Sequence, residues 1–269
     1  MISTKQKYAL YKPKKFLGQN FLVDNNIAKK IVASLDVLPD DVVIEIGPGQ
    51  GVLTKYLLGF TKNFYAVEID KSIYEKLSEE YQGKLKLIHK DFLKLDFSKD
   101  IDTVESGKIK IIGNIPYNIT TEILFKLYDS NDKIGSAVLM MQKEVARRLT
   151  AKPDTKDYGI LAIQTQLHTI PKILFNVPPT AFFPKPNVDS SIVKFDFKNS
   201  IPGLNDKILF KALVRESFGQ RRKTMRNSLK KFFERNKIDF EKIEFDFSRR
   251  PENVTIEEFK ILSNFIIKN

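Results

Sequence analysis

The first two thirds of the chain alternate between short apolar runs and stretches in which apolar residues have helical spacing. Residues 42–46 (VVIEI) form an apolar run that ends in a glycine turn, and residues 24–35 before it have apolar positions three and four residues apart. The other runs that predict strands are 64–68, 85–88, 108–113, 137–141, 161–168 and 191–197. The other stretches that predict helices are 52–58, 72–81, 121–128 and 144–150. This alternation predicts a mainly parallel sheet with helices on both faces, which is the α/β class.

The pattern changes near residues 199–203 (NSIPG), whose composition is typical of a linker. From residue 207 to the C-terminus, only helical periodicity is visible. A length of 269 residues also suits one large domain and one small domain. We therefore expect a Rossmann-like α/β domain with a basic N-terminal arm at residues 1–198. A small all-helical domain is expected at residues 199–269.

The composition excludes several kinds of functional site. The chain has no cysteine, so it has no disulfide scaffold, no thiolate nucleophile and no cysteine-based zinc or iron–sulfur site. His89 and His168 each lack a second ligand at metal spacing, so we expect no metal. No apolar run reaches membrane-spanning length, and the N-terminus lacks the apolar core of a signal peptide. We expect a cytoplasmic protein, monomeric and without a membrane partner.

The net charge of +12 is concentrated in two segments of the chain. Residues 1–15 contain five lysines and no acid, and residues 207–237 contain eleven Lys or Arg and two acids. Such clustering is the electrostatic footprint of a nucleic-acid partner, although an anionic membrane or acids elsewhere in the chain could also pair with these cations. The aromatic residues near these cations have the spacing of a helix core, so they are not available as exposed membrane anchors. This favours nucleic acid over a membrane as the partner. Four cations are predicted to contact RNA phosphates: Arg221, Arg222, Lys223 and Arg226.

Glycines and carboxylates follow three successive predicted strands. Residues 47–51 (GPGQG) form a strand-to-helix loop that lets a ligand approach the backbone closely. Glu68 and Asp70 follow the second strand, where a carboxylate can accept hydrogen bonds from both ribose hydroxyls of a nucleoside. Asp91 follows the third strand, where it can accept a hydrogen bond from an adenine amino group. These strand ends share one edge of the sheet, and the constellation resembles the S-adenosylmethionine site of class I methyltransferases.

The turn after the fourth strand, residues 113–118 (GNIPYN), carries the candidate catalytic groups. The amino nitrogen of adenine is a poor nucleophile because its lone pair is delocalised into the ring. The side-chain carbonyl of Asn114 and a backbone carbonyl of the Ile115–Pro116 turn can accept its two N–H bonds and direct the lone pair toward a methyl sulfonium. Tyr117 offers a ring on which an extruded base can stack.

Four motifs together resemble the ribosomal RNA adenine dimethyltransferase family, and its small-subunit branch in particular. They occur in the expected order, from about Lys14 to Leu229, with two mild departures: Ile115 where leucine is common and Met225 where leucine is frequent. Neither departure removes a polar group. The motifs are residues 15–22 (KFLGQNFL), 114–117 (NIPY), 178–190 (PPTAFFPKPNVDS) and 218–227 (FGQRRKTMRN).

The resemblance implies a fold, a cofactor and an activity. The fold is that of a class I methyltransferase, and the cofactor is S-adenosyl-L-methionine. The activity is dimethylation of two adjacent adenosines in the 3′-terminal hairpin of 16S rRNA, in the small (30S) subunit or its precursor. Tyr117 is expected on one face of the target base and Phe182 on the other. The implied cofactor contacts are Asn20, Leu22, Gly47, Glu68, Asp91 and Asn114.

Three other functions are alternatives to this interpretation. A large-subunit rRNA methyltransferase of the antibiotic-resistance type shares the fold and the Asn-x-Pro-Tyr turn, but we expect it to lack the sequence QRRKT of residues 220–224. A non-catalytic nucleic-acid-binding protein on the same scaffold would not need the full set of cofactor residues that this chain has. A nicotinamide oxidoreductase is disfavoured, because the glycine spacing differs from the dinucleotide-binding fingerprint.

Overall fold

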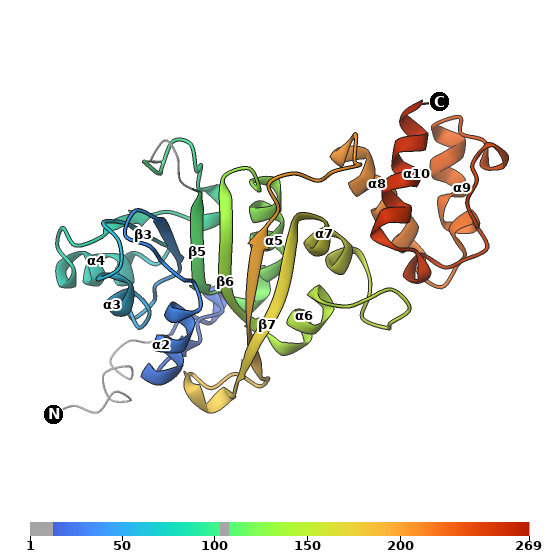
Figure 1. Ribbon diagram of the computed structural model, residues 1–269. Coiled ribbons are helices and arrows are strands. Elements are labelled where there is room, and N and C mark those ends of the chain that lie inside the picture. The colour runs from blue at the N-terminus through green and yellow to red at the C-terminus, as the bar shows by residue number, and fades with distance from the viewer. Residues whose placement is uncertain (1–12, 103–107, 269) are drawn as a thin grey trace. The chain divides into compact units, whose positions relative to one another are not determined.

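The computed structural model describes residues 13–102 and 108–268 (Figure 1). The chain forms two compact units. The first consists of Met1–Ala146 and Ile170–Lys198, and the second of Arg147–Thr169 and Asn199–Asn269. Both units are interrupted in sequence, and the last crossing between them follows Lys198. The grouping of Arg147–Thr169 with the C-terminal unit differs from the expected first domain of residues 1–198.

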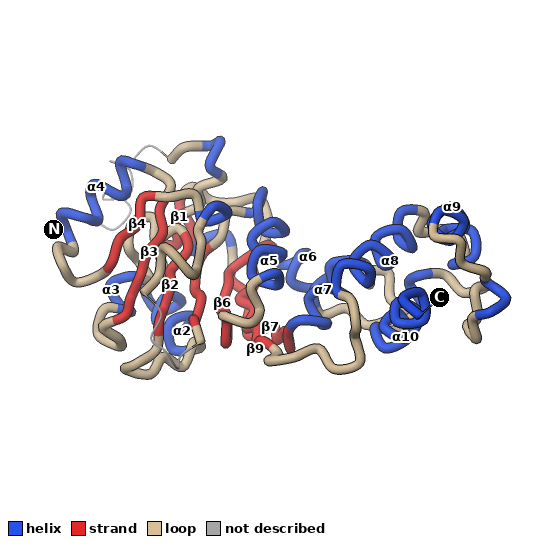
Figure 2. The backbone as a smooth tube through the Cα atoms, turned by 90° about the horizontal axis from the view of Figure 1, so that it is seen from above, coloured by secondary structure: helices blue, strands red, loops and turns tan. Residues whose placement is uncertain are grey.

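A seven-stranded mixed sheet forms the centre of the first unit, with the strand order β4-β3-β2-β5-β6-β9-β7. The strands from β4 to β6 pair in parallel, and β9 runs antiparallel to β6. Figure 2 shows β2, β3 and β4 side by side. The strands are β2 (Val42–Ile46), β3 (Asn63–Glu68), β4 (Lys86–His89), β5 (Ile109–Asn114), β6 (Ile134–Gln142), β7 (Thr169–Val177) and β9 (Ser190–Phe197). A separate pair joins β1 (Phe21–Leu22) to β8 (Phe182–Phe183).

The register of the parallel strands brings the predicted site segments to one edge of the sheet. Ile46 at the end of β2 pairs with Val67 of β3 and with Gly113 of β5, and Glu68 pairs with His89 of β4. The loops that follow these four strands therefore leave the sheet at almost the same level. This is the edge at which open α/β sheets bind ligands.

Helices in the first unit are held to the sheet by their apolar faces. Ile31 of α2 and Leu57 of α3 lie in one buried cluster with Val43 of β2 and Ile112 of β5. The carboxylate of Asp24 caps α2 by accepting from two backbone amides of its first turn. The helices of the first unit are α2 (Asn25–Ala33), α3 (Thr54–Leu57), α4 (Lys71–Glu80) and α5 (Thr120–Asp129). Helix α6 (Lys143–Leu149) begins in the first unit and ends in the second. Within residues 13–102 and 108–268, no helix is long and apolar enough to cross a membrane.

The second unit has a core of its own, built from helices. Its main helices are α7 (Ile160–His168), α8 (Lys207–Gly219), α9 (Met225–Arg235) and α10 (Ile256–Lys268). Phe210, Phe233 and Phe259 are fully buried in this core, together with Tyr158. Figure 2 draws the segment containing α8, α9 and α10 as helices and loops, in agreement with the predicted all-helical domain.

Two of the longer elements differ from the sequence prediction. Residues 161–168, expected as a strand, form helix α7, in which Ala162, Ile163 and Leu167 belong to the buried core of the second unit. A short helix buried on most sides shows no clear period, so an apolar run of this length fits either a strand or a helix. The sequence pattern does not predict strand β7, because Pro171, Lys172 and several exposed positions interrupt its apolar residues.

Candidate active site

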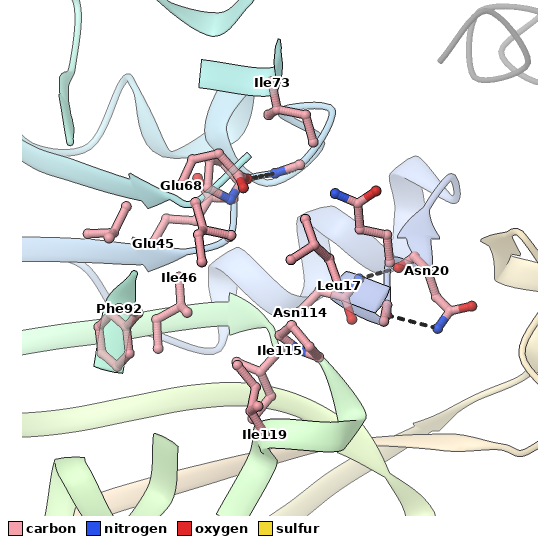
Figure 3. Close-up of a pocket in the computed structure, with 18 of the residues that line it drawn as sticks. Leu17, Asn20, Glu45, Ile46, Glu68, Ile73, Phe92, Asn114, Ile115 and Ile119 are labelled. Atoms are coloured by element: carbon pink, nitrogen blue, oxygen red, sulfur yellow. Dashed lines mark hydrogen bonds between the residues drawn. The ribbon is translucent and has the colours of Figure 1, made fainter. Parts of the chain in front are cut away.

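A cavity of about 280 Å³ lies at the carboxyl edge of the parallel strands (Figure 3). Four parts of the chain line it: the arm at residues 16–22, the glycine loop that follows β2, the ends of β3 and β4, and the turn after β5. Nine of the ten predicted catalytic and cofactor residues are among the lining residues: Asn20, Leu22, Gly47, Glu68, Asp91, Asn114, Ile115, Pro116 and Tyr117. The fold thus gathers residues that are far apart in the sequence around one space.

The glycine loop leaves bare backbone facing open space. Gly47 has φ +60°, and a Cβ atom added there would meet no atom of the described residues within 4 Å. Gly49 has φ +55°, and a Cβ atom there would lie 2.9 Å from the ring of Phe21 in the arm. Side chains are therefore excluded at Gly49 by a packed neighbour, whereas at Gly47 a side chain would fill the cavity itself. The room above Gly47 fits a cofactor that lies against the backbone.

Two carboxylates at strand ends are fixed by backbone amides. The Glu68 Oε1 atom accepts a hydrogen bond from the Asp70 amide at 2.8 Å, and Oε2 accepts from the Gly49 amide at 3.3 Å. Glu68 is only 4% exposed, and its burial raises the pKa of the carboxyl above its ordinary value. The Asp91 Oδ1 atom accepts from the Leu93 amide at 2.9 Å and caps a short 3-10 helix. Both acids therefore have preset orientations at the cavity wall.

Asn114 is oriented by the arm. Its Nδ2 atom donates a hydrogen bond to the backbone carbonyl of Asn20 at 2.7 Å (Figure 3). Only the amide nitrogen can donate to a carbonyl, so this bond fixes which way the amide faces. Within the described parts of the chain, the Oδ1 atom accepts no hydrogen bond. The arrangement leaves one carbonyl oxygen of Asn114 available to a ligand in the cavity.

The turn after Asn114 supplies a second free acceptor. The carbonyl of Pro116 accepts from the Thr120 hydroxyl at 3.1 Å and from the Ile119 amide at 3.3 Å. Among residues 13–102 and 108–268, no donor reaches the carbonyl of Ile115. Of the two carbonyls in the predicted Ile115–Pro116 turn, the structure therefore leaves that of Ile115 free.

Tyr117 is held by a residue that the sequence did not single out. Its hydroxyl lies 2.6 Å from Ser190 Oγ, and Ser190 is fully buried at the start of β9. Burial raises the pKa of the Tyr117 phenol above its ordinary value, so the group stays protonated near neutral pH. Ser190 belongs to the motif at residues 178–190, but nothing in that pattern links it to a tyrosine some seventy residues earlier.

Comparisons with known proteins agree with this geometry. A family model described as "Ribosomal RNA adenine dimethylase" matches residues 11–268. The chain belongs to the ribosomal RNA adenine dimethylase family. It is 43% identical over 257 residues to "Ribosomal RNA small subunit methyltransferase A" of Francisella tularensis subsp. novicida, covering 95% of this chain and 98% of that protein. A second relative of the same name, from F. tularensis subsp. tularensis strain WY96-3418, is 42% identical over the same length.

Solved structures show the same architecture. A dimethyladenosine transferase from Plasmodium falciparum aligns with a TM-score of 0.74 and 27% identity, covering 91% of this chain and 97% of that one. The 23S rRNA methyltransferase ErmE aligns with a TM-score of 0.64 and 23% identity, covering 92% and 100%. The second similarity supports the fold alone. Together they establish the class I methyltransferase fold expected for an rRNA adenine dimethylase.

One predicted site residue lies elsewhere in this rRNA adenine dimethylase. Phe182, expected to face the target base opposite Tyr117, is 4% exposed and is not part of the cavity wall. It pairs with Leu22 across β1 and β8, and both side chains belong to the core cluster that contains α2 and α3. Alternation along a two-residue strand puts neighbouring side chains on opposite faces. The structure therefore assigns Phe182 to the core, where it supports Leu22.

The four predicted RNA-contacting cations fall into two groups in the second unit. Arg221 Nε lies 2.8 Å from Glu252 Oε2, and its Nη2 donates to the Lys156 carbonyl at 2.6 Å. Arg226 lies 3.0 Å from Glu241 and stacks 5.2 Å from the ring centre of Phe240. The exposed side chains of Arg222 and Lys223 have no hydrogen bond or ion pair to any described residue. Two of the four cations are thus already paired within the protein.

No cluster of three or more His, Asp or Glu residues in the described chain could hold a metal ion.

One buried acid in the cavity wall was not among the site residues predicted from the sequence. Glu45 of β2 is 1% exposed, and its Oε2 accepts a hydrogen bond from Thr54 Oγ1 at 2.7 Å. Burial raises the pKa of Glu45 to about 8, and the nearby charge of Glu68 acts in the same direction. The signal that could have found Glu45 is a charged residue within an apolar strand, two positions before Gly47.

We expect the stability of this dimethylase to fall as pH rises from about 4.5 to about 8, because folded Glu45 keeps a proton that the unfolded chain releases. Glu45→Gln is neutral at every pH and can still accept the Thr54 hydroxyl. It should remove the share of this slope that comes from Glu45 and exceed the wild type in unfolding free energy by roughly 3 kcal/mol at pH 7. Urea unfolding of the two proteins at about pH 5, 7 and 9 measures the pH dependence of stability and the difference in unfolding free energy. An equal slope in the two proteins would assign the titration to another group.

Proposed function

We propose that this protein transfers methyl groups from S-adenosylmethionine to the exocyclic amino groups of two adjacent adenosines in the 3′-terminal hairpin of 16S rRNA. The substrate would be the small subunit or its precursor, in the cytoplasm, and the products dimethyladenosines. The observation that carries the proposal is the amide of Asn114, which the arm fixes at the cavity wall with its oxygen accepting no hydrogen bond from any described residue. The family and the small-subunit names of the 43% and 42% identical relatives support the choice of substrate.

The cofactor would be held by residues from three strand ends and the arm. The backbone at Gly47 offers room for its amino-acid portion, and Glu68 would accept hydrogen bonds from the ribose hydroxyls. Asp91 would bind the adenine amino group, while Asn20 and Leu22 would cover the cofactor from the arm. When bound, S-adenosylmethionine supplies a methyl group on a positively charged sulfur, which is electrophilic without help from a metal.

The target base would be held by the turn after β5. The Asn114 side-chain oxygen and the Ile115 carbonyl would accept the two N–H bonds of the adenine amino group. These bonds turn the nitrogen lone pair out of conjugation, which makes the nitrogen a better nucleophile. The Tyr117 ring, positioned by Ser190, would support the face of the extruded base. Catalysis then consists of orientation and polarisation by groups that are already in place.

Methyl transfer to isolated ribosomal subunits tests the proposed function. Protein, tritiated S-adenosylmethionine and small subunits lacking the modification should give labelled dimethyladenosine at two adjacent positions near the 3′ end of 16S rRNA. Nucleotide mapping of the product identifies these positions. Label on large subunits instead would support the antibiotic-resistance type of enzyme. Cofactor binding without label on either subunit would support a non-catalytic nucleic-acid-binding protein.

The unpaired cations of the second unit provide a separate prediction about RNA binding. We expect the Arg222→Ala/Lys223→Ala double variant to bind small subunits more weakly and with a flatter salt dependence. Removing one cation from an RNA phosphate should lower the slope of log affinity against log salt by roughly 0.7–0.9. Cofactor affinity should stay unchanged, because both residues belong to the other unit from the cavity. Filter binding across a salt series gives the slope.

Arg221→Ala is the matched control for this prediction. The charge of Arg221 is already neutralised by Glu252, so its removal should change the salt slope much less than the double substitution does. A double variant with the wild-type slope would contradict the assignment of Arg222 and Lys223 to RNA phosphates. The RNA surface would then have to be sought among other cations, such as those at residues 5–15, most of which lie outside the described chain.

A further inference from the structure

Asp70 connects the arm to the cofactor side of the cavity. Its side chain is completely buried, although Asp70 is not part of the cavity wall. The Oδ1 atom lies 2.7 Å from Lys14 Nζ, and Oδ2 accepts a hydrogen bond from Gln19 Nε2 at 3.0 Å. Oδ1 also accepts from the Ser72 amide at 3.1 Å and so caps helix α4. One buried carboxylate therefore holds two arm side chains and the start of a helix.

Gln19 closes this arrangement into a ring of contacts. While its Nε2 donates to Asp70, its Oε1 accepts a hydrogen bond from the backbone amide of Lys14 at 2.8 Å. Residues 14 and 19 are thus tied to each other as well as to Asp70, and the short 3-10 helix η1 (Lys15–Leu17) lies between them. The Asp70 amide in turn donates to Glu68 at 2.8 Å. The contacts run without a break from the arm to the acid at the ribose position.

The other end of the arm is attached to the base side of the cavity. The carbonyl of Asn20 accepts from Asn114, and Leu22 pairs with Phe182 across the two-stranded sheet. Between these two attachments, Phe21 packs against Gly49 so closely that a side chain there would clash. The segment at residues 14–22 is therefore fastened at both ends, with the cavity beneath it.

We infer that Lys14, Gln19 and Asp70 are positioning residues that form a latch, and that the latch holds the cavity-lining residues 16–19 of the arm over the bound cofactor and limits the rate of cofactor exchange. The inference rests on the proposed function. Dimethylation of two adenosines consumes four methyl groups, so the spent cofactor must leave and a fresh one must enter repeatedly. The base side of the arm is anchored by backbone pairing and core packing, whereas the latch consists of side-chain contacts to one carboxylate. The latch end is therefore the end that opens.

Dissociation of S-adenosylmethionine and S-adenosylhomocysteine from the isolated protein tests the latch, measured as release of radiolabelled compound into an excess of unlabelled compound. Lys14→Met and Gln19→Leu should each speed release about tenfold, since each removes a hydrogen bond to a buried carboxylate. Lys14→Arg should release at the wild-type rate. At saturating cofactor, kcat on small subunits should change less than KM for the cofactor, because neither residue contacts the base.

Two further variants separate a latch from a general structural role. In Lys14→Met/Asp70→Asn, release should be no faster than in Asp70→Asn alone, because both changes break the same contact. Lys110→Met removes a lysine–aspartate pair of 2.8 Å with Asp41 at the opposite edge of the sheet and should leave release unchanged. Wild-type binding with unchanged release in Lys14→Met and Gln19→Leu would overturn the latch alone. Absence of cofactor binding to the wild type would overturn the proposed function and the latch with it.

Discussion

Asn114→Ala should lower the rate of methyl transfer by on the order of 100-fold or more, because it removes an acceptor whose position is set before the base arrives. The wild-type side chain needs no reorientation, since its nitrogen is already bound to the Asn20 carbonyl at 2.7 Å. Single-turnover transfer to small subunits, at saturating protein and cofactor, measures the chemical step. The thermal unfolding midpoint of the variant should stay close to that of the wild type, because Asn114 is only half-buried.

Asn114→Asp distinguishes the two contacts of this side chain. Aspartate keeps an oxygen for the adenine amino group but cannot donate to Asn20, and it places a carboxylate next to a carbonyl. If the arm contact matters chiefly for cofactor retention, Asn114→Asp should bind the cofactor as weakly as Asn114→Ala does. Turnover near the wild-type level in Asn114→Ala would contradict the catalytic role proposed for this residue.

Glu68→Ala should weaken S-adenosylmethionine binding by roughly 1.5–3 kcal/mol, which is about a tenfold to hundredfold loss of affinity. The carboxylate is held by the amides of Gly49 and Asp70, so its removal also leaves two donors without their acceptor. Calorimetry on the isolated protein gives the cofactor affinity, and filter binding gives the RNA affinity. The RNA affinity should be unchanged, because no phosphate contact is proposed for this side chain.

Asp91→Asn is the matched comparison for Glu68→Ala, since Asp91 stands at the next strand end of the same cavity. An amide oxygen can still accept from the adenine amino group, so Asp91→Asn should weaken binding less. Unchanged cofactor affinity in Glu68→Ala would move the ribose contact to another group in the cavity wall. Asp70 is not a candidate, because both of its carboxylate oxygens bind the arm.

The parallel strands of the large sheet could be predicted because buried parallel strands appear in the sequence as apolar runs. Strands β2, β3 and β5 are almost wholly buried, and the sequence pattern predicts each within one or two residues of its actual bounds. The same property misleads at residues 161–168, where a run of buried residues is the inner helix of the second unit. Strand β7 lies at the sheet edge with one side exposed, so its apolar pattern is weak.

The candidate site was predictable to the extent that strand ends define it. Gly47, Glu68, Asp91 and Asn114 each follow or end a strand of the parallel set, so topology alone brings them together. Strand ends do not predict contacts between individual side chains that are distant in sequence. Neither the Ser190 hydroxyl beneath Tyr117 nor the pairing of Arg221 with Glu252 has a counterpart in any local pattern.

Strand β7 has a consequence for the behaviour of the protein in concentrated solution. A nine-residue strand at the edge of a sheet is a template on which another chain can add a strand, which leads to aggregation. Pro171 lacks the amide hydrogen that such pairing needs, and the charge of exposed Lys172 opposes the approach of a second apolar strand. Lys30 of helix α2 lies 4.7 Å from the ring centre of Phe175 on this strand and covers it. Pro171 and Lys172, which interrupt the apolar pattern of β7 in the sequence, therefore also oppose the pairing of this edge strand with other chains.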